Sequence, residues 1–316
     1  MKIEVKTENT YSKTEYVRAG KVGYLANRID EVINWLKEKK INADISRYSR
    51  YKQYILDFSA NHLEESGSMK NDLKKILLLS DFEEMYAKSA EAIREIYQIV
   101  YVYDQFKDEK SKGLNERLRK IVSGKDFYDR EENDQGRDFL YELVIAAEYK
   151  KKGYGIVFDS VTQTDVIAKS DDIAIYIESK RLKSDRNYER NYRKACNQLK
   201  KVDDENAIKL VYVDIYNCLK STLMTYEYSD FLDVNNFVTN CLYENFKKPN
   251  EMITQKVLNE FSEYVDGVAF TAIGTFGVNY LYGIEIDIYS GTDVMVPKSI
   301  SYDRYAFIQK ALGRKS

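Results

Sequence analysis

The chain has 316 residues, of which 44% are hydrophobic and 32% charged, and its net charge is −2. This length suits two domains, or one core with large additions. The sequence contains no apolar run near the ~18 residues of a membrane span, and its first residues lack an apolar signal segment. The three cysteines have no paired spacing, which favours a reduced compartment. We therefore expect a globular, cytoplasmic protein with no membrane partner.

The single histidine, His62, excludes several classes of enzyme. Every Ser-His-Asp or Cys-His mechanism would need this residue, and a metal site with two histidine ligands is impossible. We interpret His62 as a surface residue. The sequence also lacks the GxxxxGK[ST] loop and the GxGxxG fingerprint, which argues against nucleotide-driven motors and dinucleotide enzymes.

The first 130 residues are expected to form a helical N-terminal region. A short strand is predicted over residues 2–7, and apolar spacing of three and four predicts a helix from Tyr24, with Trp35 as a core anchor. Further helices are predicted over 45–58, 69–79, 81–100 and 114–122. In the second helix the tyrosines alternate with basic residues. They are either half-buried on an amphipathic helix or stack on nucleic-acid bases (Tyr48, Tyr51, Tyr54).

The polar stretch 123–136 is the predicted boundary between residues 1–130 and a second domain over 131–316. After it, an apolar stripe predicts a helix over 137–152, which Gly153 ends as a C-cap. A strand is expected over 155–160. The nearly continuous apolar run 207–216 predicts a central strand.

Residues 164–181 read as a β-hairpin around which this second domain is organised. Asp165 opens the first strand, and Ser170, Asp171 and Asp172 supply the turn. The second strand alternates, so that Glu178 and Lys180 share one face with Tyr176, opposite three isoleucines. The hairpin would fold Asp165 back beside Glu178 and Lys180.

Two close carboxylates repel each other unless a cation lies between them, and hard oxygen ligands suit Mg²⁺ or Mn²⁺. The alternative is that Glu178 and Lys180 form a surface ion pair. Acid-x-Lys triplets recur along the chain, but only Glu178-Lys180 ends an alternating apolar strand whose partner strand begins with an aspartate.

A helix predicted over 184–202 has a divided surface. One side carries the stripe Tyr188, Tyr192, Cys196 and Leu199, and the other carries Arg186, Arg190, Arg193, Lys194 and Lys201, with Gln198 above Lys194. Positive charge gathers in residues 135–203, whereas 204–316 are acidic in balance. A basic stripe beside a metal site suits attraction of a phosphate backbone; the alternative is a solvated helix face.

The hairpin pattern resembles the PD-(D/E)xK nuclease superfamily, which has the restriction-endonuclease-like fold. The resemblance implies that Asp165 and Glu178 hold the metal ion, with the carbonyl of Ser179, and that Lys180 positions and activates the attacking water. Thr164 stands where the family has proline. The predicted order of helix, three strands, helix and strand over about 137–216 matches the core of that superfamily.

The helix over 137–152 resembles the opening helix of methyl-directed restriction enzymes and archaeal Holliday-junction resolvases. In those enzymes a glutamate on this helix can reach the metal site, and here that position is Glu142. The alternative is that Glu142 is a solvated helix residue. The family often has a glutamine on its second helix, which Gln198 matches loosely; the family's second glutamine is missing.

The remaining residues, 217–316, form an extension with helical patterns at 231–246 and 251–265 and strands at 267–273 and 280–289. Gly274 and Gly277 are expected in the connection between these strands. Glu285 and Asp287 share a strand face, which is either exposed or a second metal pair. This acidic extension is expected either to extend the core sheet or to bind a partner; a partner chain or a second copy is expected to bind through this extension or the N-terminal region.

These patterns together predict an α/β protein with a restriction-endonuclease-like core and a helical N-terminal region. The expected function is Mg²⁺-dependent or Mn²⁺-dependent endonuclease cleavage of DNA, and the resemblance further implies antiviral defence. Two alternatives remain open: a catalytically inactive nuclease fold used for binding or assembly, and an RNase.

Overall fold

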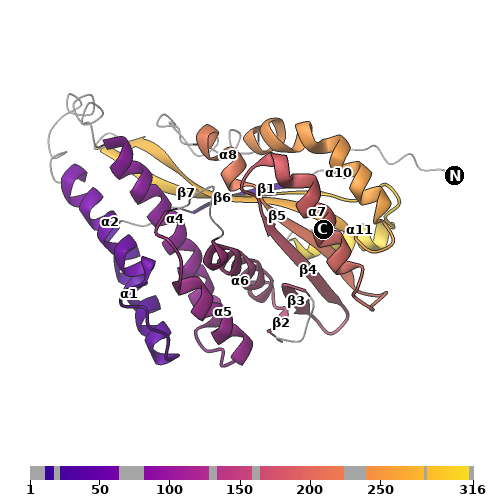
Figure 1. The fold of residues 1–316 in the computed structure, drawn as a ribbon, viewed down its shortest axis with the longest axis horizontal. Helices are drawn as coiled ribbons and strands as arrows, with labels where there is room; N and C mark the ends of the chain where they lie inside the picture. The colour runs from indigo at the N-terminus through magenta and orange to yellow at the C-terminus, as the bar shows by residue number, and fades with distance from the viewer. Residues whose placement is uncertain are drawn as a thin grey trace.

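The computed structural model describes residues 11–17, 22–63, 82–127, 134–158, 164–223, 240–280 and 283–312 (Figure 1). The strand predicted over 2–7, the helix predicted over 69–79 and most of the helix predicted over 231–246 lie outside these ranges. Within the described ranges, no helix is both long and apolar enough to cross a membrane.

The protein is α/β, as predicted, and is built on a mixed, open sheet. The described strands form one seven-stranded sheet in the order β1-β7-β6-β5-β4-β3-β2. The pairs β4–β5 and β5–β6 are parallel, and the other neighbours are antiparallel. The strands are β1 Tyr11–Val17, β2 Gly155–Val157, β3 Val166–Lys169, β4 Ala174–Arg181, β5 Ile208–Asp214, β6 Gly267–Tyr280 and β7 Gly283–Met295.

Four N-terminal helices lie at one end of the molecule (Figure 1). They are α1 Val22–Glu38, α2 Arg47–Leu63, α4 Phe82–Phe106 and α5 Lys112–Val122, and they confirm the helices predicted in these described segments. Helices α1, α2 and α4 pack against one another, and α5 packs against α6 (Gln135–Lys151). Trp35 is buried, as predicted. One continuous hydrophobic cluster runs from α1 through α4 into the sheet. The domain boundary at 123–136 therefore stays a prediction.

Two of the three tyrosines of α2 are not available to stack on bases. Tyr48 and Tyr51 are fully buried and pack edge to face, with ring centroids 6.0 Å apart. Beneath them Arg47 and Arg137 pair with the buried carboxylate of Glu95 at 3.3 and 2.9 Å. The base-stacking alternative is wrong for these two rings, because neither has an exposed face.

The central part of the chain has the predicted element order of helix, three strands, helix and strand. Helix α6 (Gln135–Lys151) precedes β2, β3 and β4, and helix α7 (Tyr188–Leu199) leads to β5. Gly153 (φ 90°) ends α6 in a Schellman motif, in which its N–H donates to Lys150 and that of Tyr154 donates to Tyr149. The rings of Tyr149 and Tyr154 then pack edge to face. This motif turns the chain from α6 into β2.

The C-terminal part was only partly predictable. Its elements are α8 (Tyr216–Leu223), a π-helical turn at Tyr243–Lys247 that leads into α10 (Lys248–Glu260), and α11 (Tyr302–Ala311). The helix predicted over 251–265 is therefore confirmed with an earlier start, whereas β1 and α11 were not predicted. Glu285 and Asp287 lie in β7, but their side chains are outside the described set.

The positions of Gly274 and Gly277 correct the sequence prediction. Both lie inside β6 rather than in the connection to β7. Gly274 pairs with Tyr289, and a Cβ at Gly274 would lie 2.0 Å from the Tyr289 hydroxyl. The glycine makes room for a buried cross-strand ring, so its role is packing and not turn formation.

We expect Gly274→Ala to destabilise the protein by about 1–3 kcal/mol, because the added methyl group overpacks a site that a fully buried ring cannot leave. Chemical denaturation measures the loss. Gly155→Ala is the matched control, since its nearest atom would be at 3.6 Å, an ordinary contact. Equal stability of the two variants would contradict this packing role.

Candidate active site

The β3–β4 hairpin brings Asp165 back to the end of β4, as the sequence predicted. Val166 pairs with Ile177, so Asp165, one residue earlier, lies opposite Glu178. The Oδ2 atom of Asp165 accepts hydrogen bonds from the backbone N–H of Ser179 at 2.7 Å and from its hydroxyl at 3.0 Å. These two donors fix the carboxylate at this end of the sheet.

One ammonium group serves two carboxylates at this point. The Nζ atom of Lys180 lies 3.1 Å from Oε2 of Glu178 and 3.8 Å from Oδ2 of Asp165. Glu178 is fully buried, and its other oxygen, Oε1, has no hydrogen-bond partner. Glu178, which is buried, thus forms a cluster with the half-buried Lys180 and Asp165 and not a surface ion pair.

Helix α6 brings a third carboxyl group to the cluster. Glu142 is buried, which excludes the alternative of a solvated helix residue. Burial and the nearby charge of Asp165 raise the pKa of Glu142 to about 8. The same two causes, in the same order, raise the pKa of Glu178 to about 8. Two neighbouring carboxyl groups with raised pKa values are typical of sites that bind a cation or transfer protons.

Arg117 of α5 also belongs to the site, and sequence reasoning missed it. Its Nε donates to Oε2 of Glu142 at 3.4 Å, and its Nη2 donates to the backbone carbonyl of Asp165 at 3.2 Å. Helix α5 can approach because Gly113 has no side chain; a Cβ there would lie 1.7 Å from the carbonyl oxygen of Phe158. No local pattern in the sequence marks this contact, which the tertiary fold creates.

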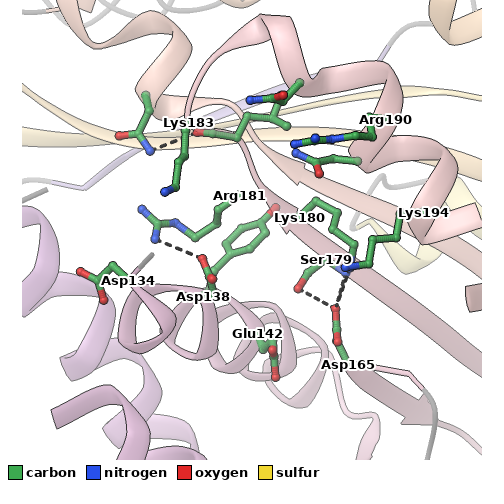
Figure 2. A pocket seen from close by; sticks show the side chains of 15 residues that line it. Asp134, Asp138, Glu142, Asp165, Ser179, Lys180, Arg181, Lys183, Arg190 and Lys194 are labelled. Atoms are coloured by element: carbon green, nitrogen blue, oxygen red, sulfur yellow. Dashed lines mark hydrogen bonds and ion pairs between the residues drawn. The ribbon is translucent and has the colours of Figure 1, made fainter. Parts of the chain in front are cut away.

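Glu142, Asp165 and Lys180 line a pocket of about 530 Å³, whereas Glu178 and Arg117 lie behind its lining (Figure 2). Its walls come from α6, the two hairpin strands and α7, and the lining includes Glu142, Asp165, Ser179, Lys180, Arg190 and Lys194. Two of the predicted phosphate-binding residues, Arg190 and Lys194, therefore face the carboxylate cluster from α7. The buried stripe predicted for this helix is confirmed.

The other predicted phosphate-binding residues lie outside this lining. Arg193 pairs with Glu189 at 2.9 Å and with Glu260 of α10. Arg186 is exposed on the short turn before α7, and Gln198 is half-buried. Helix α7 packs against α10 as well as against the site. A basic residue on α7, such as Arg193, can therefore point away from the site.

A second group of polar side chains at the pocket was not predicted. Arg181 pairs with Asp214 at 3.1 Å and with Asp138 at 3.5 Å. Lys183 and Asn217 line the same part of the pocket. Figure 2 shows Asp134, Asp138, Arg181 and Lys183 on one side of the view and Asp165, Ser179, Lys180 and Lys194 on the other.

The donor set suits a hard divalent cation. Among the described residues, no group of three or more His, Cys, Asp or Glu side chains is arranged to hold a metal ion. Magnesium sites commonly need only one or two carboxylates, the rest of the shell being water and phosphate oxygens. Asp165 and Glu178 supply two adjacent carboxylates, and Oε1 of Glu178 lacks a partner. The role of the Ser179 carbonyl stays a prediction.

Comparison with known proteins leaves the chain without an identified relative. No protein-family model, no curated protein and no solved structure matches it.

The raised pKa of Glu178 predicts a specific pH dependence of metal-free stability. Its pKa of about 8 in the folded protein exceeds the value of about 4.3 in an unfolded chain, so the folded state binds more protons between these values. Stability should therefore fall as pH rises from 5 to 8. Glu178→Gln should exceed the unfolding free energy of the wild type at pH 8, and by a smaller margin at pH 5. Denaturation in EDTA at each pH tests this, and parallel pH profiles would contradict it.

Proposed function

We propose that this protein is a metal-dependent nuclease that hydrolyses phosphodiester bonds in DNA. The observation that carries the proposal is the pocket in which Asp165, Lys180 and Glu142 meet the basic face of α7, with the buried Glu178 paired to Lys180 at its edge. The proposal includes a restriction-endonuclease-like core over residues 137–216. It is supported by the order α6-β2-β3-β4-α7-β5, with an antiparallel β2–β3–β4 unit and parallel β4 and β5.

In this proposal each residue has a separate role in in-line hydrolysis. Asp165 and Glu178 would hold Mg²⁺ or Mn²⁺, which supplies Lewis-acid stabilisation of the charge that develops on the phosphate. Lys180 lies within hydrogen-bond distance of Glu178 and points at the same space, where it would orient the attacking water. Because its pKa is about 8, Glu142 is protonated near neutral pH and would be able to donate a proton beside Asp165.

The α7 wall of the pocket suits a phosphate backbone. Arg190 and Lys194 are exposed basic residues at this wall, and no described carboxylate forms a salt bridge with either one. Arginine and lysine attract phosphates through charge, and their effect does not depend on base sequence. A role in defence against foreign DNA remains part of the proposal, on the resemblance alone.

The decisive assay incubates the purified protein with plasmid, single-stranded DNA and RNA in Mg²⁺, Mn²⁺ or EDTA. We expect cleavage of DNA with either metal and none in EDTA. Glu178→Ala should lower the rate at least about a hundredfold, since one ligand and the partner of Lys180 are lost together. Cleavage of RNA alone would make the protein an RNase, and binding without any cleavage would make it an inactive module. Equal cleavage by the mutant would remove Glu178 from the site.

The basic wall gives a second test, with binding measured in Ca²⁺ to hold the site without turnover. Arg190→Ala combined with Lys194→Ala should reduce the slope of log affinity against log salt by about two, because each phosphate contact contributes about 0.9. Arg193→Ala is the matched control on the same helix, since its side chain is paired with Glu189 and Glu260. An unaltered slope in the double mutant would show that Arg190 and Lys194 are solvated surface residues that do not contact phosphates.

Arg117 gives a third test, of positioning. Removing its guanidinium releases both Glu142 and the backbone at Asp165, so Arg117→Ala should lower kcat about ten- to a hundredfold and change KM little. Arg117→Lys should recover part of the loss. Arg119→Ala is the control, because Arg119 is exposed on the same helix. A KM effect alone, or equal losses in both alanine variants, would argue against positioning.

A further inference from the structure

The candidate pocket has a second end whose chemistry differs from that of the carboxylate cluster. Asp138, Arg181, Lys183 and Asn217 line this end, away from Asp165 and Lys180 (Figure 2). None of these four residues is needed to hold a metal ion or to attract a phosphate backbone. Their side chains nevertheless converge on the same space.

The charges at this end are balanced. The Nε of Arg181 pairs with Asp214 at 3.1 Å and its Nη1 with Asp138 at 3.5 Å. Lys183 adds a second positive charge. Asp134, a third carboxylate at this end, pairs with Arg137 of α6. Arg181 and Lys183 are therefore offset by Asp138 and Asp214, and this end has no excess positive charge with which to attract a phosphate. A neutral, polar group is the better match to it.

Two buried polar atoms at this end have no hydrogen-bond partner among the described residues. They are Nη2 of Arg181, a donor, and Oδ1 of Asn217, an acceptor. The side chain of Arg181 is 7% exposed and Asn217 is 6% exposed. The Asn217 amide nitrogen donates to the carbonyl of Leu182, which fixes which end of the amide is the free acceptor. Unpaired groups of this kind destabilise the folded protein unless a ligand or water satisfies them.

Tyr141 also lines the pocket, but it is only 7% exposed and its hydroxyl shares a hydrogen bond with Oγ1 of Thr271 at 2.5 Å, so it offers no free ring face for stacking. An arginine donor and an amide acceptor are the groups that recognise a nucleobase by its edge.

We propose that this end of the pocket binds the base of an unpaired nucleotide whose phosphate lies at Asp165, Glu178 and Lys180. The inference rests on the proposed nuclease function and names its substrate class. A base stacked and paired in a duplex cannot enter a lateral pocket, whereas a single-stranded or flipped base can. The preferred substrate is therefore single-stranded DNA, or DNA with locally unpaired bases.

The test compares two fluorescent single strands of equal length and charge, one of ordinary DNA and one of abasic deoxyribose phosphate. Both present the same phosphates, so a difference in affinity reports the bases. In Ca²⁺ we expect the wild type to bind ordinary DNA about tenfold or more tightly. Arg181→Lys and Asn217→Ser should reduce this preference to about twofold or less and leave abasic binding unchanged. Arg193→Ala should keep the full preference.

A measurement without variants guards against misfolding. A single strand carrying one 4-thiothymidine can be photocrosslinked to the wild type in Ca²⁺, and the attached peptides identified by mass spectrometry. Crosslinks within residues 134–141, 181–183 or 216–217 support the subsite. Crosslinks elsewhere only, or equal binding of ordinary and abasic strands, overturn it and assign the unpaired atoms to water.

The cleavage assay separates this inference from the function on which it rests. Metal-dependent cleavage with no preference for base-bearing or single strands would reject the subsite and leave the nuclease proposal standing. A base preference without cleavage in any metal would reject the nuclease and leave a binding pocket.

Discussion

The register of the β3–β4 hairpin is the constraint on which the candidate site depends. Pairing of Val166 with Ile177 places Asp165 opposite Glu178, and the two donors of Ser179 then fix the Asp165 carboxylate. A slip of one residue would turn every side chain of one strand to the other face and separate the acids. Burial of the isoleucines of β4 opposes such a slip, so hydrophobic packing specifies the position of the charged groups.

The same packing shifts the protonation of the carboxyl groups in the candidate site. Glu142 and Glu178 are buried beside Asp165, and both have a raised pKa because the ionised carboxylates lose water and repel one another. Lys180 and Arg117 relieve part of this repulsion. Arg117 comes from α5, and the buried pair of Arg137 with Glu95 ties the start of α6 to α4. The helical N-terminal region is thus part of the site's framework.

Sequence reasoning reached the features that local periodicity encodes. Alternation in β4, the three-four spacing of α1 and the divided surface of α7 each predicted an element that the structure contains. It missed Arg117, Arg181 and Asn217 because their roles arise from contacts between distant segments. The full burial of Tyr48 and the pairing of Arg193 with Glu260 were not predicted for the same reason. Nothing within α2 shows which elements cover Tyr48, and nothing within α7 shows that Glu260 faces it.

The central claim is that Asp165 and Glu178 together hold a divalent cation. Calorimetric titration of metal-free protein with Mn²⁺ tests this claim without any assumption about the substrate. We predict that the wild type binds Mn²⁺ at one or two sites. The tightest site should be lost in Asp165→Asn and in Glu178→Gln but kept in the surface variant Arg119→Ala. Identical isotherms for the wild type and both carboxylate variants would contradict the account.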